Sequence, residues 1–212
     1  PKGPNVPLLQ LAVIAIVQGV TEFLPISSSA HLRLIPLLSD WPDQGLLIDV
    51  AVHVGTLFAV IAYLWRDCLE MVLGLTRLGA GMDDPGLRMI LYLVVSTIPV
   101  VIVGFVLTAY FGDAWRNSLA LIAWSTLGFG IALQAADRFG LTIHRIEHMT
   151  VGAAFTIGLA QVIALIPGAS RAGVTMTAAR MLGYERSDAA RFSMLMSIPT
   201  IIAAGTLATY EI

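Results

Sequence analysis

Apolar residues fill four stretches of the chain, each about 20 residues long, the length that an α-helix needs to cross a bilayer. These stretches are residues 46–65, 89–110, 118–135 and 189–210. The composition agrees, because 57% of the residues are hydrophobic and 12% are charged, about half the charged share of a soluble domain. The pattern predicts an all-α polytopic membrane protein.

Two further apolar stretches, residues 8–24 and 151–166, end early at a proline that is followed by small and polar residues. Proline lacks a backbone N–H and obstructs helix continuation, so the helices should break at Pro25 and Pro167. Non-helical backbone at membrane depth is tolerated only where it is buried in protein or lines a wet cavity. The sequence therefore predicts two re-entrant broken-helix hairpins, with residues 32–38 and 175–182 as the returning arms.

Basic residues fall mostly on one side of the membrane if each hairpin returns to the side that it entered. The other side receives Lys2 and Arg116, while Arg33 is unassigned and Arg171 lies at a hairpin tip. The positive-inside rule then makes the arginine-rich side cytoplasmic, so the first hairpin enters from outside and the second from the cytoplasm. Residues 66–78, which mix charges with apolar residues, should lie along the cytoplasmic interface. The arginine-rich side receives Arg66, Arg77, Arg88, Arg138, Arg145, Arg180, Arg186 and Arg191.

The two hairpins resemble each other in sequence. Aligning Pro25 with Pro167 places Ser28 against Ser170, and a glutamine lies seven residues before the first proline and six before the second. Because the hairpins enter from opposite faces, they would form inverted-topology repeats whose broken helices meet near the midplane. We expect one membrane domain over residues 1–212, with a first repeat of about 1–117 and a second of about 118–212. The chain stops just after an apolar run, and we expect it to be part of a longer protein.

Four ionisable side chains lie at predicted membrane depth, where such groups usually serve function: Glu22, His31, His53 and Arg171. An arginine fork binds phosphate oxygens, and small residues such as Gly168 let backbone N–H groups approach an anion. A serine next to a base becomes a nucleophile, and a carboxylate can hold a divalent cation. Together these groups indicate phosphoryl transfer.

Structural explanations compete with the functional ones. Ser27, Ser28 and Ser29 are also good caps for the returning helix. His53 is also suited to packing between helices, and Glu22 with Arg171 to a buried salt bridge.

The residues around both tips resemble the signatures of the bacterial undecaprenyl-diphosphate phosphatases of the bacitracin-resistance type. Residues 18–31 (QGVTEFLPISSSAH) are similar to the first signature, and residues 167–175 (PGASRAGVT) are similar to the second. Residues 49–56 (DVAVHVGT) and 191–199 (RFSMLMSIP) also match in style and order. The likeness covers essentially the whole chain, and members of this family usually continue for further spans.

The resemblance implies hydrolysis of the C55 isoprenoid diphosphate to the monophosphate in the bacterial inner membrane, with the site open to the periplasm. It implies a divalent cation, Mg²⁺ or Ca²⁺, held by Glu22 and Gln18. It also implies that Ser28 is the nucleophile, that His31 activates it or binds phosphate, and that Arg171 clamps the diphosphate. Other substrate-binding positions implied are Ser27, Ser29, His53, Gly168, Ser170 and Thr175.

Two positions depart from the family pattern. Gln18 stands where a second glutamate is common, so a metal site built on two carboxylates is in doubt. Ala172 stands where a second serine is common, which removes one hydroxyl.

Three other functions are open at this stage. A metal-independent lipid phosphatase needs a histidine after Ser170-Arg171, and none occurs before Asp188. A transporter or flippase of isoprenoid lipid phosphates fits the broken helices. Peptide hydrolysis by a Ser–His membrane protease has no evident role for Glu22 or Arg171. The expected partners are the lipid substrate and membrane lipids, with no nucleic acid. The attacking group (Ser28, His31 or water) and a homodimeric state are left open.

Overall fold

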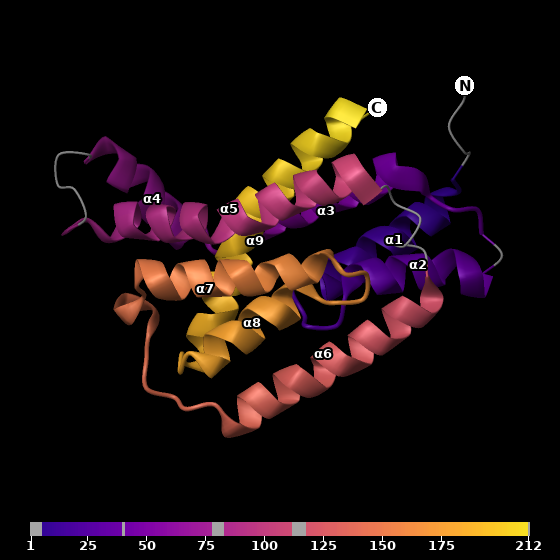
Figure 1. Cartoon of the computed structure of the whole chain (residues 1–212). Coiled ribbons are helices and arrows are strands. Elements are labelled where there is room, and N and C mark those ends of the chain that lie inside the picture. The colour runs from indigo at the N-terminus through magenta and orange to yellow at the C-terminus, as the bar shows by residue number, and fades with distance from the viewer. Residues whose placement is uncertain (1–5, 40, 78–82, 112–117, 212) are drawn as a thin grey trace.

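The computed structural model describes residues 6–39, 41–77, 83–111 and 118–211. Within these ranges the regular elements are helices, apart from one isolated β-bridge between His144 and Tyr184. Figure 1 shows the helices lying side by side in a bundle. Their bounds are α1 Leu8–Thr21, α2 Ser28–Ser39, α3 Gly45–Tyr63, α4 Trp65–Thr76, α5 Pro85–Phe111, α6 Leu119–Phe139, η3 Ile146–His148, α7 Val151–Gln161, η4 Val162–Leu165, α8 Arg171–Met181 and α9 Arg186–Glu211.

Three of these helices are long and apolar enough to cross a membrane, over Pro85–Tyr110, Leu119–Phe139 and Arg186–Thr206. A fourth span is possible if Leu47–Tyr63 and Trp65–Thr76 are one bent unit, although the two helices meet at 82°. The predicted all-α, multi-pass architecture is confirmed. The bend separates α4 from the span before it, at the start of the segment that was predicted to lie along the interface.

Both predicted hairpins are present as pairs of short helices, α1 with α2 and α7 with α8. The first break is a turn in which Ser27 has a φ of 58°, and the second turn contains Gly168 with a φ of 90°. The returning helices begin earlier than predicted, at Ser28 and Arg171. Capping explains the second start, because the Ser170 hydroxyl accepts a hydrogen bond from Gly173 N–H at 3.2 Å. The inverted-repeat relation between the hairpins stays a prediction.

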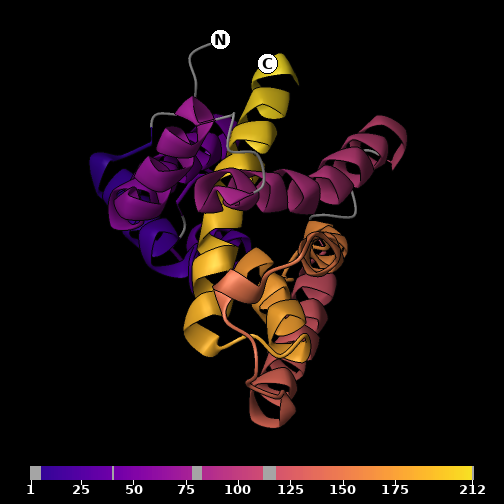
Figure 2. The same cartoon turned by 90° about the vertical axis from the view of Figure 1, so that its left-hand side faces the viewer.

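Helix α9 runs between the amino-terminal helices on one side and α6, α7 and α8 on the other (Figure 2). It packs against α3, α5 and α8, and its Phe192, Leu195 and Met196 are fully buried. Helices α5 and α7 cross closely because Gly158 has no side chain, and a Cβ there would clash with the backbone of Ser96. Helix α9 therefore joins α3 and α5 to the second hairpin through one core.

Arginines concentrate at one end of the bundle, on the left in Figure 1, where α3, α6 and α8 end and α5, α7 and α9 begin. Ion pairs tie these helix ends together: Arg191 with Asp67, Arg186 with Asp137 at 2.5 Å and Arg145 with Glu185 at 3.1 Å. The separation of charge along the bundle agrees with the predicted distribution. Lys2 and Arg116 lie outside the described residues.

Candidate active site

Glu22 is the centre of a polar cluster at the tip of the first hairpin. It follows the last residue of α1 and is only 8% exposed. Its Oε2 atom accepts hydrogen bonds from Gln18 Nε2 at 3.0 Å and from Ser28 Oγ at 2.6 Å. Gln18 reaches it because residues four apart share a helix face, and Ser28 reaches it because the chain reverses between them. Gln18, Glu22 and Ser28 therefore form one hydrogen-bonded group, and the contact between Glu22 and Ser28 was not predicted from the sequence.

Arg171 joins the second hairpin to this cluster. It is the first residue of α8, and its Nη2 lies 3.2 Å from Glu22 Oε1, across 149 positions of sequence. Its Nη1 donates to the Ser193 carbonyl of α9 at 3.0 Å. One guanidinium nitrogen is thus held by protein backbone and another by the carboxylate. The salt bridge that was weighed as a structural alternative is formed, and it places Arg171 beside Ser28.

The two hairpin tips also touch through backbone and capping groups. Ser170 Oγ donates to the Leu24 carbonyl at 3.4 Å, and a Cβ at Gly173 would contact Pro25. Ser170 thus serves both as the cap of α8 and as a link to the first tip. The sequence prediction that the broken helices converge is confirmed by these contacts and by the Glu22–Arg171 pair.

His31 is tied to the strained turn rather than to Ser28. Its Nδ1 lies 2.8 Å from the Ser27 carbonyl, which can only accept, so this nitrogen carries the proton. The Ser27 hydroxyl lies 3.3 Å from that of Ser29 and accepts from Ala30 N–H at 3.4 Å. In the described contacts Ser28 therefore pairs with Glu22, and no Ser28–His31 pair is formed.

His53 is the histidine that lies against the carboxylate. Its Nε2 is 3.6 Å from Glu22 Oε2, while Nδ1 is bound by the Asp49 carbonyl at 2.7 Å. Because Nδ1 donates to the Asp49 carbonyl, the ring is oriented with Nε2 toward the carboxylate of Glu22. Its side chain is 32% exposed, so it borders both the carboxylate and the surrounding medium.

Two predicted substrate-binding positions serve internal packing here. The Thr175 hydroxyl is buried, lies 2.7 Å from the Ser193 hydroxyl and also donates to the Arg171 carbonyl. Gly168 packs against α6, where a Cβ would clash with Ser125 and the Ile122 backbone. The sequence reasoning missed Ser193 and Ser125. Ser193 lies in the segment 191–199 that resembles a family motif, and that likeness was its only signal.

The cluster fits a divalent cation only when the substrate supplies further ligands. Among the described residues no group of three or more histidine, cysteine or acidic side chains is arranged to hold a metal. Glu22 supplies a carboxylate, and the buried Gln18 Oε1 has no hydrogen-bond partner. Mg²⁺ is often held by one or two carboxylates together with substrate phosphates. The donors present match that arrangement.

Comparison with known proteins identifies the family of this chain. The sequence model of the family described as "Bacitracin resistance protein BacA" matches residues 11–212. The "Undecaprenyl-diphosphatase 1" of Rhodospirillum rubrum is 52% identical over 206 residues, which cover 94% of this chain and 73% of that protein. The "Undecaprenyl-diphosphatase" of Roseobacter denitrificans is 51% identical over 201 residues, covering 94% and 75%. That of Jannaschia sp. is 52% identical over 207 residues, covering 97% and 77%. The chain belongs to the BacA family of bacitracin resistance proteins.

Proposed function

We propose that this protein hydrolyses undecaprenyl diphosphate to undecaprenyl phosphate and phosphate, and so recycles the lipid carrier of cell-wall synthesis. The observation that supports this most directly is the arrangement around Glu22. One carboxylate oxygen accepts the Ser28 hydroxyl at 2.6 Å, and the other lies 3.2 Å from Arg171. A nucleophile, a base and a phosphate-binding cation thus adjoin one another. The relatives' names supply the substrate class, and the cluster supplies the matching chemistry.

In the proposed first step, Ser28 Oγ attacks the terminal phosphorus and its proton passes to Glu22 Oε2. The bond between that phosphorus and the bridging oxygen breaks, and its electron pair leaves with undecaprenyl phosphate. This leaving group is already a weak base and needs no proton at neutral pH. In the second step water attacks the Ser28 phosphate ester, releases inorganic phosphate and restores the hydroxyl. Glu22 returns the first proton to Ser28 Oγ as that oxygen leaves phosphorus, accepts a proton from the attacking water, and then releases it to the surrounding water, which restores the carboxylate.

Arg171 is proposed to bind the non-bridging oxygens of the diphosphate. Its planar fork suits this task, and the Ser193 carbonyl fixes the direction of the fork by holding one nitrogen at 3.0 Å. When phosphate oxygens arrive, they would compete with Glu22 for Nη2. Weakening that pair would leave the carboxylate freer to accept the Ser28 proton.

We propose Mg²⁺ or Ca²⁺ as the cofactor, held by Glu22 and the free Gln18 Oε1 together with diphosphate oxygens. When bound, the cation would neutralise charge on the diphosphate. His53 is proposed to border the bound phosphate from the side of α3. His31 is proposed to hold Ser27 in its left-handed conformation and so to aim Ser28.

The proposed location is the bacterial inner membrane, with the site open to the periplasm. The arginine-rich end of the bundle supports this orientation, because the positive-inside rule places it in the cytoplasm. A transporter of isoprenoid lipid phosphates is the alternative function. A transporter would also use the broken helices, but transport does not require the hydrogen bond between Ser28 and Glu22.

The test is phosphate release from undecaprenyl diphosphate by the purified full-length protein in nanodiscs. We expect one phosphate per lipid from the wild type and none above background from Arg171→Ala. The control is Arg145→Ala, which removes an exposed arginine that pairs with Glu185. A folded wild type that binds the lipid but releases no phosphate with any divalent cation would overturn the enzyme and favour the transporter.

A further inference from the structure

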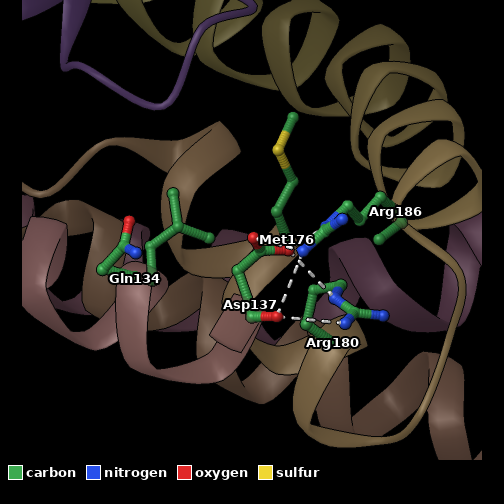
Figure 3. A pocket seen from close by; sticks show the side chains of 7 residues that line it. Gln134, Asp137, Met176, Arg180 and Arg186 are labelled. Atoms are coloured by element: carbon green, nitrogen blue, oxygen red, sulfur yellow. Dashed lines mark hydrogen bonds and ion pairs between the residues drawn. The ribbon is translucent and has the colours of Figure 1, made fainter. Parts of the chain in front are cut away.

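A hollow lies at the arginine-rich end of the bundle, away from Glu22, between the last turns of α6 and α8 and the first turn of α9. It has a volume of ≈ 270 Å³, and Asp137, Arg180 and Arg186 supply its charged lining (Figure 3). Leu133 and Met176 supply its apolar wall. A wider hollow of ≈ 550 Å³ adjoins it through the same charged residues and adds Arg138 and Thr142. No part of the proposed phosphatase mechanism uses either of them.

Positive charge exceeds negative charge in these hollows. Asp137 is shared by two guanidinium groups, with Arg186 Nε at 2.5 Å and Arg180 Nε at 3.4 Å. Arg138 follows Asp137 in sequence and is exposed. Glu185 also lines the wider hollow, but it pairs with Arg145 at 3.1 Å. Arg138, Arg180 and Arg186 therefore face Asp137 as the one lining carboxylate that is not paired with an arginine outside the hollows, which leaves the site net positive and suited to an anion.

Arg180 makes the wall of the hollow rigid. Its side chain is 4% exposed, and its Nη1 and Nη2 donate to the carbonyls of Tyr184, Asp137 and Gly140. It also donates to Thr142 Oγ1 at 3.2 Å. The buried Nε has no hydrogen-bond partner, only the ion-pair contact with Asp137. The connection that follows α6 is thus fastened to the α8–α9 turn, with positive charge behind it.

Large apolar side chains project from this fastened connection. Phe139, Leu141 and Ile143 are 78%, 69% and 62% exposed, and Met181 at the end of α8 is 74% exposed. Phe139 is the last residue of α6 and ends the Leu119–Phe139 span, and Leu141 and Ile143 follow it in the connection toward η3. Apolar residues beside arginines are typical of surfaces that dip into a membrane interface.

We propose that this end of the bundle is a binding site for an anionic phospholipid, distinct from the phosphatase site. The lipid phosphate would lie against Arg138 and Arg186, and an acyl chain would lie along Leu141 and Ile143. Basic hollows between transmembrane helices on the cytoplasmic side bind such headgroups. The charge excess, the rigid wall and the exposed apolar row all favour a phospholipid over a free anion, which has no use for the apolar row.

The test is native mass spectrometry of the full-length protein released from nanodiscs that contain equal phosphatidylglycerol and phosphatidylcholine. We expect the wild type to retain phosphatidylglycerol in preference. The double variant Arg138→Ala/Arg186→Ala should lose that preference by about fivefold for each arginine removed. The matched control Arg77→Ala removes an exposed arginine at the same end but outside the hollows, and it should keep the preference. Equal retention of both lipids by the wild type would overturn the proposal.

A second measurement covers the case in which the double variant unfolds. A nitroxide at position 141, in a Leu141→Cys/Cys68→Ser protein, should be more accessible to oxygen than to a water-soluble nickel complex. Greater accessibility to nickel would place the apolar row in water and contradict the proposal. Phosphate release measured in the same nanodiscs is a separate readout, so a failed lipid site and a failed phosphatase can be told apart.

Discussion

The Glu22–Arg171 pair predicts an unusual relation between two substitutions. Arg171→Met removes the positive charge but keeps an unbranched side chain in its place. Glu22 then remains as a carboxylate whose side chain is 7% exposed and whose nearest fixed cation is gone. Adding Glu22→Gln to the same protein removes the isolated charge and keeps the shape. We therefore expect the double variant to be more stable than Arg171→Met alone.

The magnitude follows from the partners that Glu22 retains. Removing one member of a buried ion pair costs about 3–5 kcal/mol of unfolding free energy. Gln18 and Ser28 still donate to Oε2 after Arg171→Met, and an isolated buried carboxylate can take up a proton instead of staying charged. Both effects lower the cost, so we expect about 3 kcal/mol for Arg171→Met. Glu22→Gln in that background should recover about 2 kcal/mol, because no buried charge then lacks a partner.

The assay is a denaturant titration of the full-length protein in mixed micelles, followed by far-ultraviolet circular dichroism. A matched control is Arg145→Met, whose ion pair with Glu185 has side chains that are 66% and 37% exposed. An exposed pair contributes about 0–1 kcal/mol, so this control should change little. Strictly additive effects of Arg171→Met and Glu22→Gln would refute the reasoning, because additivity would mean that the two groups do not interact.

Three further predictions concern the turn, the helix crossing and the cation. His31→Asn should keep more phosphatase activity than His31→Ala, because its amide N–H can still donate to the Ser27 carbonyl; equal loss in a steady-state assay would exclude this anchoring role. Gly158→Ala should lower the unfolding free energy by about 1–3 kcal/mol, because its Cβ would meet the Ser96 backbone, whereas Gly152→Ala should not, because its Cβ would meet only the Thr150 hydroxyl at an ordinary contact distance of 3.9 Å. Chelation with EDTA should abolish phosphate release and added Mg²⁺ or Ca²⁺ should restore it; full activity in EDTA would remove the cation from the account.

Much of the fold could be predicted because it follows from local physical chemistry. Long apolar runs must be helices in a membrane, and a proline followed by small and polar residues must interrupt them. The convergence of the two tips, which carry Glu22 and Arg171, was also predicted, because the broken helices of inverted repeats meet. The structure places these two side chains 3.2 Å apart.

Other features could not be predicted from the sequence because they depend on the backbone dihedral angles and side-chain directions of single residues. His31 is nearer to Ser28 in sequence than Glu22 is, so it was the natural candidate for activating Ser28. Ser27, however, adopts a φ of 58°, and this turn directs Ser28 toward Glu22. No proline or glycine lies at the 82° bend between α3 and α4, so the sequence did not indicate it. The hollow beside Arg180 is formed by residues of α6, α8 and α9, and no sequence motif marks these residues.

The central claim is that Ser28, held by Glu22, is the group that attacks the diphosphate. The most direct test is the rate of phosphate release from undecaprenyl diphosphate by Ser28→Ala, beside Ser29→Ala as the neighbouring control. We expect Ser28→Ala to lose about a thousandfold or more of the wild-type rate, while Ser29→Ala keeps most of it. A Ser28→Ala protein that releases phosphate near the wild-type rate would contradict the claim and make water the attacking group.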